Sequence, residues 1–142
     1  MYKTVLLAID PGADDSWTFA LPQALNVCRA SGARLHMVTV VPDFGMSIVG
    51  QYFPAGYEKQ AAEKAMGTLH SFTAEHVPED VKVRHVVGEG NVYEVILDTA
   101  KKIEADLIVI AAHRPGHTDF LLGSNAARVV RHAKCSVLVA RG

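Results

Sequence analysis

The fold of this chain is decided by residues 106–140, which read DLIVIAAHRPGHTDFLLGSNAARVVRHAKCSVLVA. The segment opens with an apolar run at 106–112 and closes with a second apolar run at 135–140. Between these runs, apolar residues recur at the spacing of one helix face, at Ala126, Val129, Val130 and Ala133. Two apolar strands joined by an amphipathic helix form a β-α-β unit, and the strands of such a unit run parallel.

The same alternation extends back to the N-terminus. Further apolar strands are predicted at residues 3–9, 34–41 and 81–87. Between these strands, apolar residues recur at the spacing of one helix face; we call each such set a helical stripe. The stripes run from Trp17 to Cys28, from Ala62 to Phe72 and from Val92 to Ile103. The pattern predicts one domain over residues 1–142.

Single residues predict where these helices begin and end. Gly32 and Pro78 are expected to end the first two helices. Asn91, with Glu94 three residues later, predicts an N-cap for the third. Pro22 stands inside the first helical stripe and is expected to kink it.

The strands can be ranked by expected burial. Those at 3–9 and 106–112 are almost continuously apolar, as central parallel strands are, whereas residues 81–84 alternate as in an edge strand. This ranking predicts an α/β fold, a single doubly wound, Rossmann-like domain with a five-stranded parallel sheet of order 3-2-1-4-5 and four helices. The topological switch point then falls between strands 1 and 4.

Composition restricts the class of protein. The chain has 142 residues, 49% of them hydrophobic, and a formal net charge of −1. Such a balance gives no electrostatic reason to bind nucleic acid or an anionic membrane. The opening residues 1–9 lack the features of a signal peptide, so a cytoplasmic protein is expected. Cys28 and Cys135 show no ligand spacing and are expected to pack as small hydrophobes.

Two segments are more apolar than their expected places suggest. Residues 136–140 form the predicted edge strand, and an exposed apolar edge is usually covered. A second copy of the chain would cover it in a two-fold dimer; a short strand shielded by loops is the alternative. Residues 42–56 are long for a loop and carry Met46, Ile48, Tyr52 and Phe53, which suits a lid or an interface.

Ligands of open α/β sheets bind beyond the carboxyl ends of the strands at the switch point. The residues predicted there are Ala8, Ile9, Asp10, Thr39, Val40, Ile110, His113, Arg114, Gly123, Ser124, Asn125 and Ala126. The last four open the fourth helix, where unpaired N–H groups and the helix dipole favour an anion such as a phosphate. Alternatively, Ser124 or Asn125 only caps the helix.

The charged members of this set also have two interpretations each. Asp10 would bond a ribose hydroxyl or hold Mg²⁺ beside a phosphate, or it would organise the Asp-Pro-Gly turn after the first strand. His113 and Arg114 would supply positive charge and stacking to a nucleotide, or they would form a polar loop with a salt bridge.

Several catalytic and phosphate-binding motifs are missing from the sequence. There is neither a GxxxxGK[ST] loop nor a GxSxG elbow. Gly88-Glu89-Gly90 lacks the third glycine of a dinucleotide fingerprint and predicts a tight turn. We therefore assign no catalytic residue.

The stretch IVIAAHRPGHTDFLLGSNAARVVRHAKCSVLVAR, residues 108–141, resembles the C-terminal half of the bacterial universal stress proteins, the small single-domain F and G types in particular. The opening residues 2–10, YKTVLLAID, resemble the first strand of that family and its terminal aspartate. The spacing of the elements between them also fits, so the resemblance extends over the whole chain.

The resemblance implies this five-stranded fold and a homodimer formed through the last strand, 136–140, with a tetramer as the larger possibility. It also implies ATP binding through a motif written G-x2-G-x9-G-[ST]. Anchored on Gly123-Ser124, the two earlier glycines of that motif fall on Ile110 and His113. A side chain there would crowd the phosphate, or Arg114 would replace the backbone donors with a charged fork.

The family's site residues can be carried onto this sequence. Its adenine and ribose contacts would fall on Ala8, Asp10 and Val40, and its phosphate contacts near His113 and residues 123–126. The leading function is a stress-response regulator or sensor that binds ATP, with Mg²⁺ at Asp10. One alternative is an interaction module that binds no nucleotide. The other is an ATP hydrolase, whose turnover would be slow because, apart from Asp10, only Asp14 or Asp15 offers an acid near the crevice.

Overall fold

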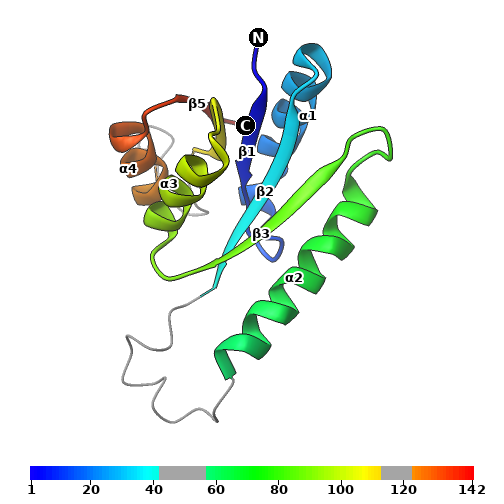
Figure 1. The fold of residues 1–142 in the computed structure, drawn as a ribbon, viewed down its shortest axis with the longest axis vertical. Coiled ribbons are helices and arrows are strands. Elements are labelled where there is room, and N and C mark those ends of the chain that lie inside the picture. The colour runs from blue at the N-terminus through cyan, green and yellow to red at the C-terminus, as the bar shows by residue number, and fades with distance from the viewer. Residues whose placement is uncertain (42–56, 113–122) are drawn as a thin grey trace.

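The computed structural model describes residues 1–41, 57–112 and 123–142. The predicted loop at 42–56 and the residues His113 to Gly116 lie outside this part of the chain. The elements, in order, are β1 (Thr4–Ala8), the 3-10 turn η1 (Asp14–Ser16), α1 (Ala20–Ser31), β2 (Arg34–Val41), α2 (Tyr57–His76), β3 (Val83–Glu89), α3 (Val92–Ile103), β4 (Leu107–Ala111), α4 (Ser124–His132) and β5 (Ser136–Ala140) (Figure 1).

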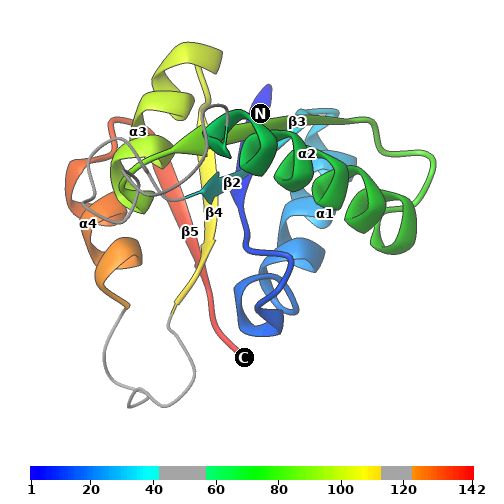
Figure 2. The same ribbon diagram turned by 90° about the horizontal axis from the view of Figure 1, so that it is seen from below.

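The five strands form one parallel sheet in the order β3-β2-β1-β4-β5, which confirms the predicted topology. Helices α1 and α2 cover one face of the sheet, and α3 and α4 cover the other (Figure 2). The doubly wound α/β arrangement of four helices around a parallel sheet is therefore the one that the sequence predicts.

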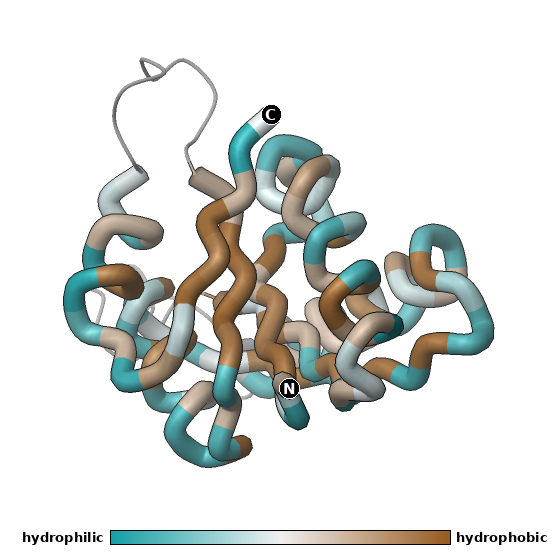
Figure 3. Tube along the Cα trace, turned by 90° about the horizontal axis from the view of Figure 1, so that it is seen from above, coloured by the Kyte–Doolittle hydropathy of each residue, from teal (hydrophilic) through white to brown (hydrophobic). Residues whose placement is uncertain are grey.

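Burial follows the predicted ranking of the strands. Four of the five residues of β1 and four of the five residues of β4 are buried, whereas β3, at one edge, has no buried residue. Figure 3 shows the apolar strands in the centre, flanked by helices that carry most of the hydrophilic residues. Aliphatic side chains on both faces of a strand require a layer of helices on each side.

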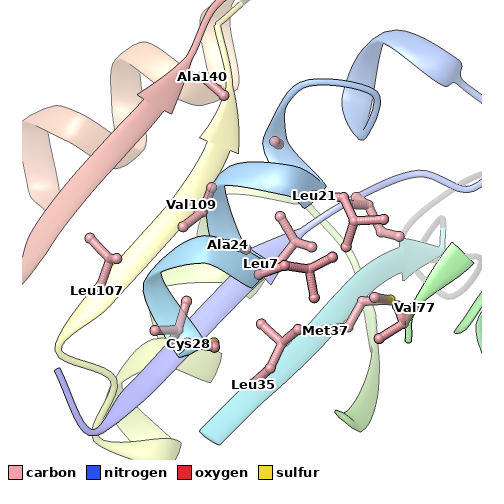
Figure 4. Close-up of a cluster of buried hydrophobic side chains, with 14 of the residues drawn as sticks. Leu7, Leu21, Ala24, Cys28, Leu35, Met37, Val77, Leu107, Val109 and Ala140 are labelled. Carbon is pink, nitrogen blue, oxygen red and sulfur yellow. The ribbon is translucent and has the colours of Figure 1, made fainter. Parts of the chain in front are cut away.

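Alternate residues of each central strand belong to two separate hydrophobic clusters, one on each face of the sheet. Leu7 and Val109 face α1, where Leu21, Ala24 and Cys28 cover them (Figure 4). Leu6 and Ile108 point to the other face and pack with residues of α3 and α4. Both sides of the sheet are thus filled, and the carboxyl ends of the strands are left for a ligand.

Helix α1 begins later than its apolar stripe suggests. The helix starts at Ala20, so Pro22 lies in the first turn, where a missing N–H breaks no intrahelical bond, and the predicted kink is wrong. Trp17 precedes the helix and packs edge-on against Phe72, with ring centroids 5.1 Å apart. Gly32 ends the helix in the left-handed conformation, as predicted.

The first turn of α3 lies very close to β3. Asn91 occupies the predicted N-cap position, but its side chain makes no capping hydrogen bond. Gly88 belongs to β3 and not to the predicted turn, in which only Gly90 has a positive φ, of 119°. A Cβ on Gly88 would lie 2.2 Å from Cγ1 of Val95. Glycine here serves the close approach of α3 to the strand.

Helix α4 buries a narrower face than the sequence predicts. Ala126 and Val129 are buried and Ala133 is partly buried, but Val130 is 45% exposed. Cys28 is buried, as expected, whereas Cys135 is only partly buried. No helix in the described part of the chain is long and apolar enough to cross a membrane.

Two buried side-chain nitrogens, Nε1 of Trp17 and Nδ1 of His36, lack a hydrogen-bond partner within the described residues. Burial lowers the pKa of His36, and the charges of Arg84 and Arg34 lower it further. His85 on β3 has its pKa lowered by burial and by His70, whose ring centroid is 4.1 Å away. Both histidines therefore favour the neutral form in the folded protein.

We expect Gly88→Ala to lower the free energy of unfolding by about 1–3 kcal/mol, because the new methyl group collides with Val95. Adding Val95→Ala should restore part of this loss, since it removes the colliding atoms. Gly67→Ala in α2 is the control: its Cβ would meet nothing within 4 Å, and alanine favours helix by up to about 1 kcal/mol. Urea unfolding measures all of these; equal effects at positions 67 and 88 would contradict the packing described.

The stability of the protein should fall on acidification below about pH 6.5. The unfolded histidines take up protons there, whereas folded His36 and His85 do so only at lower pH, so acid favours the unfolded chain. Urea unfolding of nucleotide-free protein between pH 7 and pH 5 measures the slope. The double variant His36→Gln, His85→Gln should have a shallower slope; an unchanged slope would show that other groups cause it.

Candidate functional site

The site lies where the chain leaves the sheet in opposite directions. β1 pairs with β2 on one side and with β4 on the other, so the segments that follow these strands diverge at their carboxyl ends. A cleft of about 500 Å³ opens there. It brings together ten of the twelve predicted site residues, namely Ala8, Ile9, Asp10, Thr39, Val40, Ile110, Gly123, Ser124, Asn125 and Ala126. We call it the switch-point cleft.

The other two predicted residues, His113 and Arg114, lie outside the described residues. The structure adds lining residues that the sequence analysis missed: Ala13, Ser16, Val38, Val92, Ile96 and Ala111. Asp15, which the sequence analysis placed near the crevice, lines the cleft as well. Val38 and Ala111 neighbour predicted residues along the chain, and Ala13 and Ser16 belong to the segment that follows Asp10. Val92 and Ile96 do not, because they come from α3, whose approach to the strand ends depends on helix packing.

Asp10 organises the turn that follows β1. Its Oδ1 accepts a hydrogen bond from the N–H of Gly12 at 3.0 Å, which makes the turn that the sequence predicts. The hydroxyl of Ser16 accepts from the N–H of Asp10 and donates to its carbonyl oxygen, both at 2.8 Å. The backbone at Asp10 is therefore fixed from two sides, and its carboxylate stands at the wall of the cleft.

The backbone of Val40 reaches past the end of β1. The N–H of Ile9 donates to the carbonyl of Val38, so the polar backbone groups of Val38 point toward β1. Residues alternate along a parallel ladder, and those of Val40 point the same way. β1 ends at Ala8, and Pro11 has no N–H to donate. Val40 therefore lies beyond the last β1–β2 pair, with its polar backbone groups directed toward the switch point.

The first turn of α4 supplies further donors. The first bond of the helix runs from the N–H of Ala127 to the carbonyl of Gly123, so the N–H groups of residues 124–126 precede the intrahelical ladder. Gly123, which has no side chain, is the N-cap, so the interpretation of Ser124 or Asn125 as the cap is wrong. Within the described residues, no side-chain hydrogen bond caps the helix. The helix dipole adds about half a positive charge at this end.

The floor of the switch-point cleft is apolar. It is made by residues of the second hydrophobic cluster: Ala8, Val38, Ile96, Ile110 and Ala126. Ile110, at the first glycine position of the phosphate motif, lies within β4 and is buried there. Its side chain therefore belongs to the floor of the cleft as well as to the core. The cleft thus combines the polar groups of the first turn of α4 with an apolar floor.

A second cleft, of about 470 Å³, lies beside α2 and shares Asp10, Thr39 and Val40 with the first. Helix α2 contributes Gln60, Lys64 and Thr68 to its wall. The described residues hold no group of three or more His, Cys, Asp or Glu side chains placed to hold a metal ion. The polar groups of the switch-point cleft are therefore the donors at the start of α4, the hydroxyls of Ser16 and Thr39, and the carboxylates of Asp10 and Asp15.

Comparison with known proteins identifies the relatives of this chain. The "Universal stress protein G" of Salmonella typhimurium is 29% identical over 144 residues, which cover 99% of this chain and 100% of the relative. The structure of the universal stress protein UspA from Lactobacillus plantarum matches with a TM-score of 0.70 and 25% identity, covering 99% of this chain and 98% of that chain.

A universal stress protein solved in complex with cAMP also matches, with a TM-score of 0.60 and 25% identity over 97% of this chain and 95% of that chain. The model of the family described as "Universal stress protein family" matches residues 1–141. That match extends over all but the last residue, and the chain belongs to the universal stress protein family.

Proposed function

We propose that this protein binds ATP in the switch-point cleft and acts as a stress-response regulator or sensor in the cytoplasm. The observation that carries the proposal is the convergence, in one cleft, of the first turn of α4, which no described side chain caps, with Val40, which lies beyond the last β1–β2 pair. The first suits phosphate, and the second suits the edge of a planar base. Asp10 also lines the cleft.

The fit can be followed group by group. Phosphate oxygens would accept hydrogen bonds from the N–H groups of residues 124–126 and from the hydroxyl of Ser124. The carboxylate of Asp10 would accept a bond from a ribose hydroxyl or hold Mg²⁺. The C=O of Val40 would accept from the adenine amino group, while its N–H donates to the ring nitrogen beside it. Guanine presents the opposite donor and acceptor along that edge, so adenine should be preferred.

The relative solved in complex with cAMP supports an adenine nucleotide as the class of ligand. Ile110, in place of a motif glycine, lies in β4 rather than in the phosphate loop, so it need not crowd the phosphates. His113 and Arg114 stay predicted contacts. A protein-interaction module that binds no nucleotide is the second candidate; the departures from the motif glycines favour it.

We assign no catalytic residue, and ATP hydrolysis at this site, if measured, should be slow. Asp10 already accepts a bond from Gly12, and Asp15 stands at the 3-10 turn beside it. A turnover of about 1 per second or more, as in ordinary kinases, would contradict this assignment.

Binding can be tested by isothermal titration of nucleotide-free protein with ATP and GTP, with and without Mg²⁺. We expect ATP to bind more tightly than GTP, and Ser124→Ala to weaken ATP binding roughly three- to tenfold through the lost hydroxyl. The same variant should change the free energy of unfolding by less than about 0.5 kcal/mol, because Ser124 caps nothing. Gly123→Val, which adds bulk at the helix start, should weaken binding further.

A matched control is Ser71→Ala, which removes a hydroxyl from an exposed residue of α2 outside the switch-point cleft. It should bind ATP as the unchanged protein does. Asp10→Asn keeps an oxygen for the N–H of Gly12, so it tests the negative charge without removing the turn. Absence of any nucleotide binding by the unchanged protein would leave the interaction module as the better function.

We also propose a homodimer formed through β5, with a tetramer as a larger assembly. β5 stands at the edge of the sheet, and Val137 and Val139 are only partly buried there. The N–H of Ala112 donates to the carbonyl of Ala140, so the polar backbone groups of Ala140 face β4. By alternation, those of Val137 and Val139 face outward and are open to a second copy.

Val137→Pro removes an outward N–H without breaking a bond to β4, so it should shift the protein from dimer to monomer. Val137→Thr keeps both the N–H and the branched shape and should stay dimeric. Sedimentation equilibrium at tens of micromolar protein measures both, with circular dichroism to check the fold. A monomeric unchanged protein, or a proline variant that stays dimeric, would contradict assembly through this edge.

A further inference from the structure

We propose that Val92, at the start of α3, forms the outer wall of the base end of the switch-point cleft and packs against the face of the nucleotide base. The inference rests on the proposed function and extends it to a residue of a helix that the sequence analysis left out of the site. Val92 lines the cleft and is nevertheless 36% exposed. One turn later, Ile96 is only 1% exposed and forms part of the floor.

The position of Val92 suits a planar apolar group. Val38 and Val40 of β2 line the same cleft, so apolar side chains from the strand and from the helix both border it. Within the described residues, Thr39 is the one hydroxyl contributed by β2 to this cleft. A base lying there would gain dispersion and lose contact with water, and it would cover the exposed part of Val92.

The helix turn that carries Val92 is held in place from two sides. Val95 packs so closely on Gly88 of β3 that a Cβ at position 88 would lie 2.2 Å from it. Tyr93 packs under the guanidinium of Arg128 in α4, whose Cζ lies 5.0 Å from the ring centroid. Both anchored residues follow Val92 in the first turn of α3, so that turn is held against β3 and α4. A base that packs on Val92 would therefore meet a side chain on an already ordered turn.

A second exposed valine offers a matched comparison. Val130 of α4 is 45% exposed but does not line the switch-point cleft. Both valines lie on helices, and both lose the same atoms on substitution by alanine. A difference between them in nucleotide affinity would therefore come from the place of Val92 and not from the general effect of shortening an exposed valine.

The experiment measures ATP and ribose 5-phosphate binding by isothermal titration for the unchanged protein, Val92→Ala, Val92→Ile and Val130→Ala. Val92→Ala should weaken ATP binding about three- to tenfold and leave ribose 5-phosphate binding unchanged, because that ligand has no base. Val92→Ile should keep the affinity for ATP, and Val130→Ala should change neither ligand. Thermal unfolding checks that each variant folds.

Methyl-labelled valine provides a direct readout in the ATP complex. Nuclear Overhauser effects are expected between adenine protons and a methyl pair whose signals vanish in Val92→Ala. If the unchanged protein binds ATP but Val92→Ala binds it equally well, the inference about Val92 is overturned while the proposed function stands. Equal weakening of ATP and ribose 5-phosphate would also overturn it, because the residue would then act through the fold. An unchanged protein that binds no ATP would overturn both.

Discussion

The rest of the structure depends on the pairing of β1 with a strand on each side. β1 is bonded to β2, which follows it closely in sequence, and to β4, which lies about a hundred residues further along. Asp106 fixes the start of the second pairing: its carboxylate accepts from the N–H of Lys3 at 2.8 Å and from that of Thr4 at 3.1 Å. These bonds lower the pKa of Asp106. Because β1 has a strand on each side, the segments that follow these strands diverge at their carboxyl ends. The switch-point cleft lies where they diverge.

The strand order could be predicted because burial leaves a clear pattern in the sequence. A strand buried on both faces must be apolar along most of its length. The runs at 3–9 and 106–112, which form β1 and β4, are almost continuously apolar. The errors concern boundaries and close contacts. Whether Pro22 kinks a helix depends on a start that differs by three residues from the start of the stripe. Whether Gly88 is strand or turn depends on Val95, which approaches it from another element.

Most residues of the switch-point cleft could also be predicted, because the strand assignment determines which residues stand at the strand ends. Residues at strand ends follow from the strand assignment, so Asp10, Val40 and Ile110 could be placed without a structure. The contribution of α3 could not be, because it depends on how far the helix extends over the sheet. The interpretation of Ser124 as a cap failed for a more local reason: the helix begins one residue earlier than that interpretation requires, with Gly123 at the cap.

The aromatic contact at Trp17 has a practical consequence. Trp17 is the single tryptophan of the chain, and it directly follows Ser16, whose hydroxyl braces the backbone of Asp10. Its ring also packs against His76, with centroids 4.5 Å apart, so α2 contributes to its surroundings. The fluorescence of an indole ring changes with the groups that contact the ring and with the polarity of its surroundings. The protein therefore carries an intrinsic optical probe at the junction of the first turn, α2 and the rim of the cleft, which reports without any label.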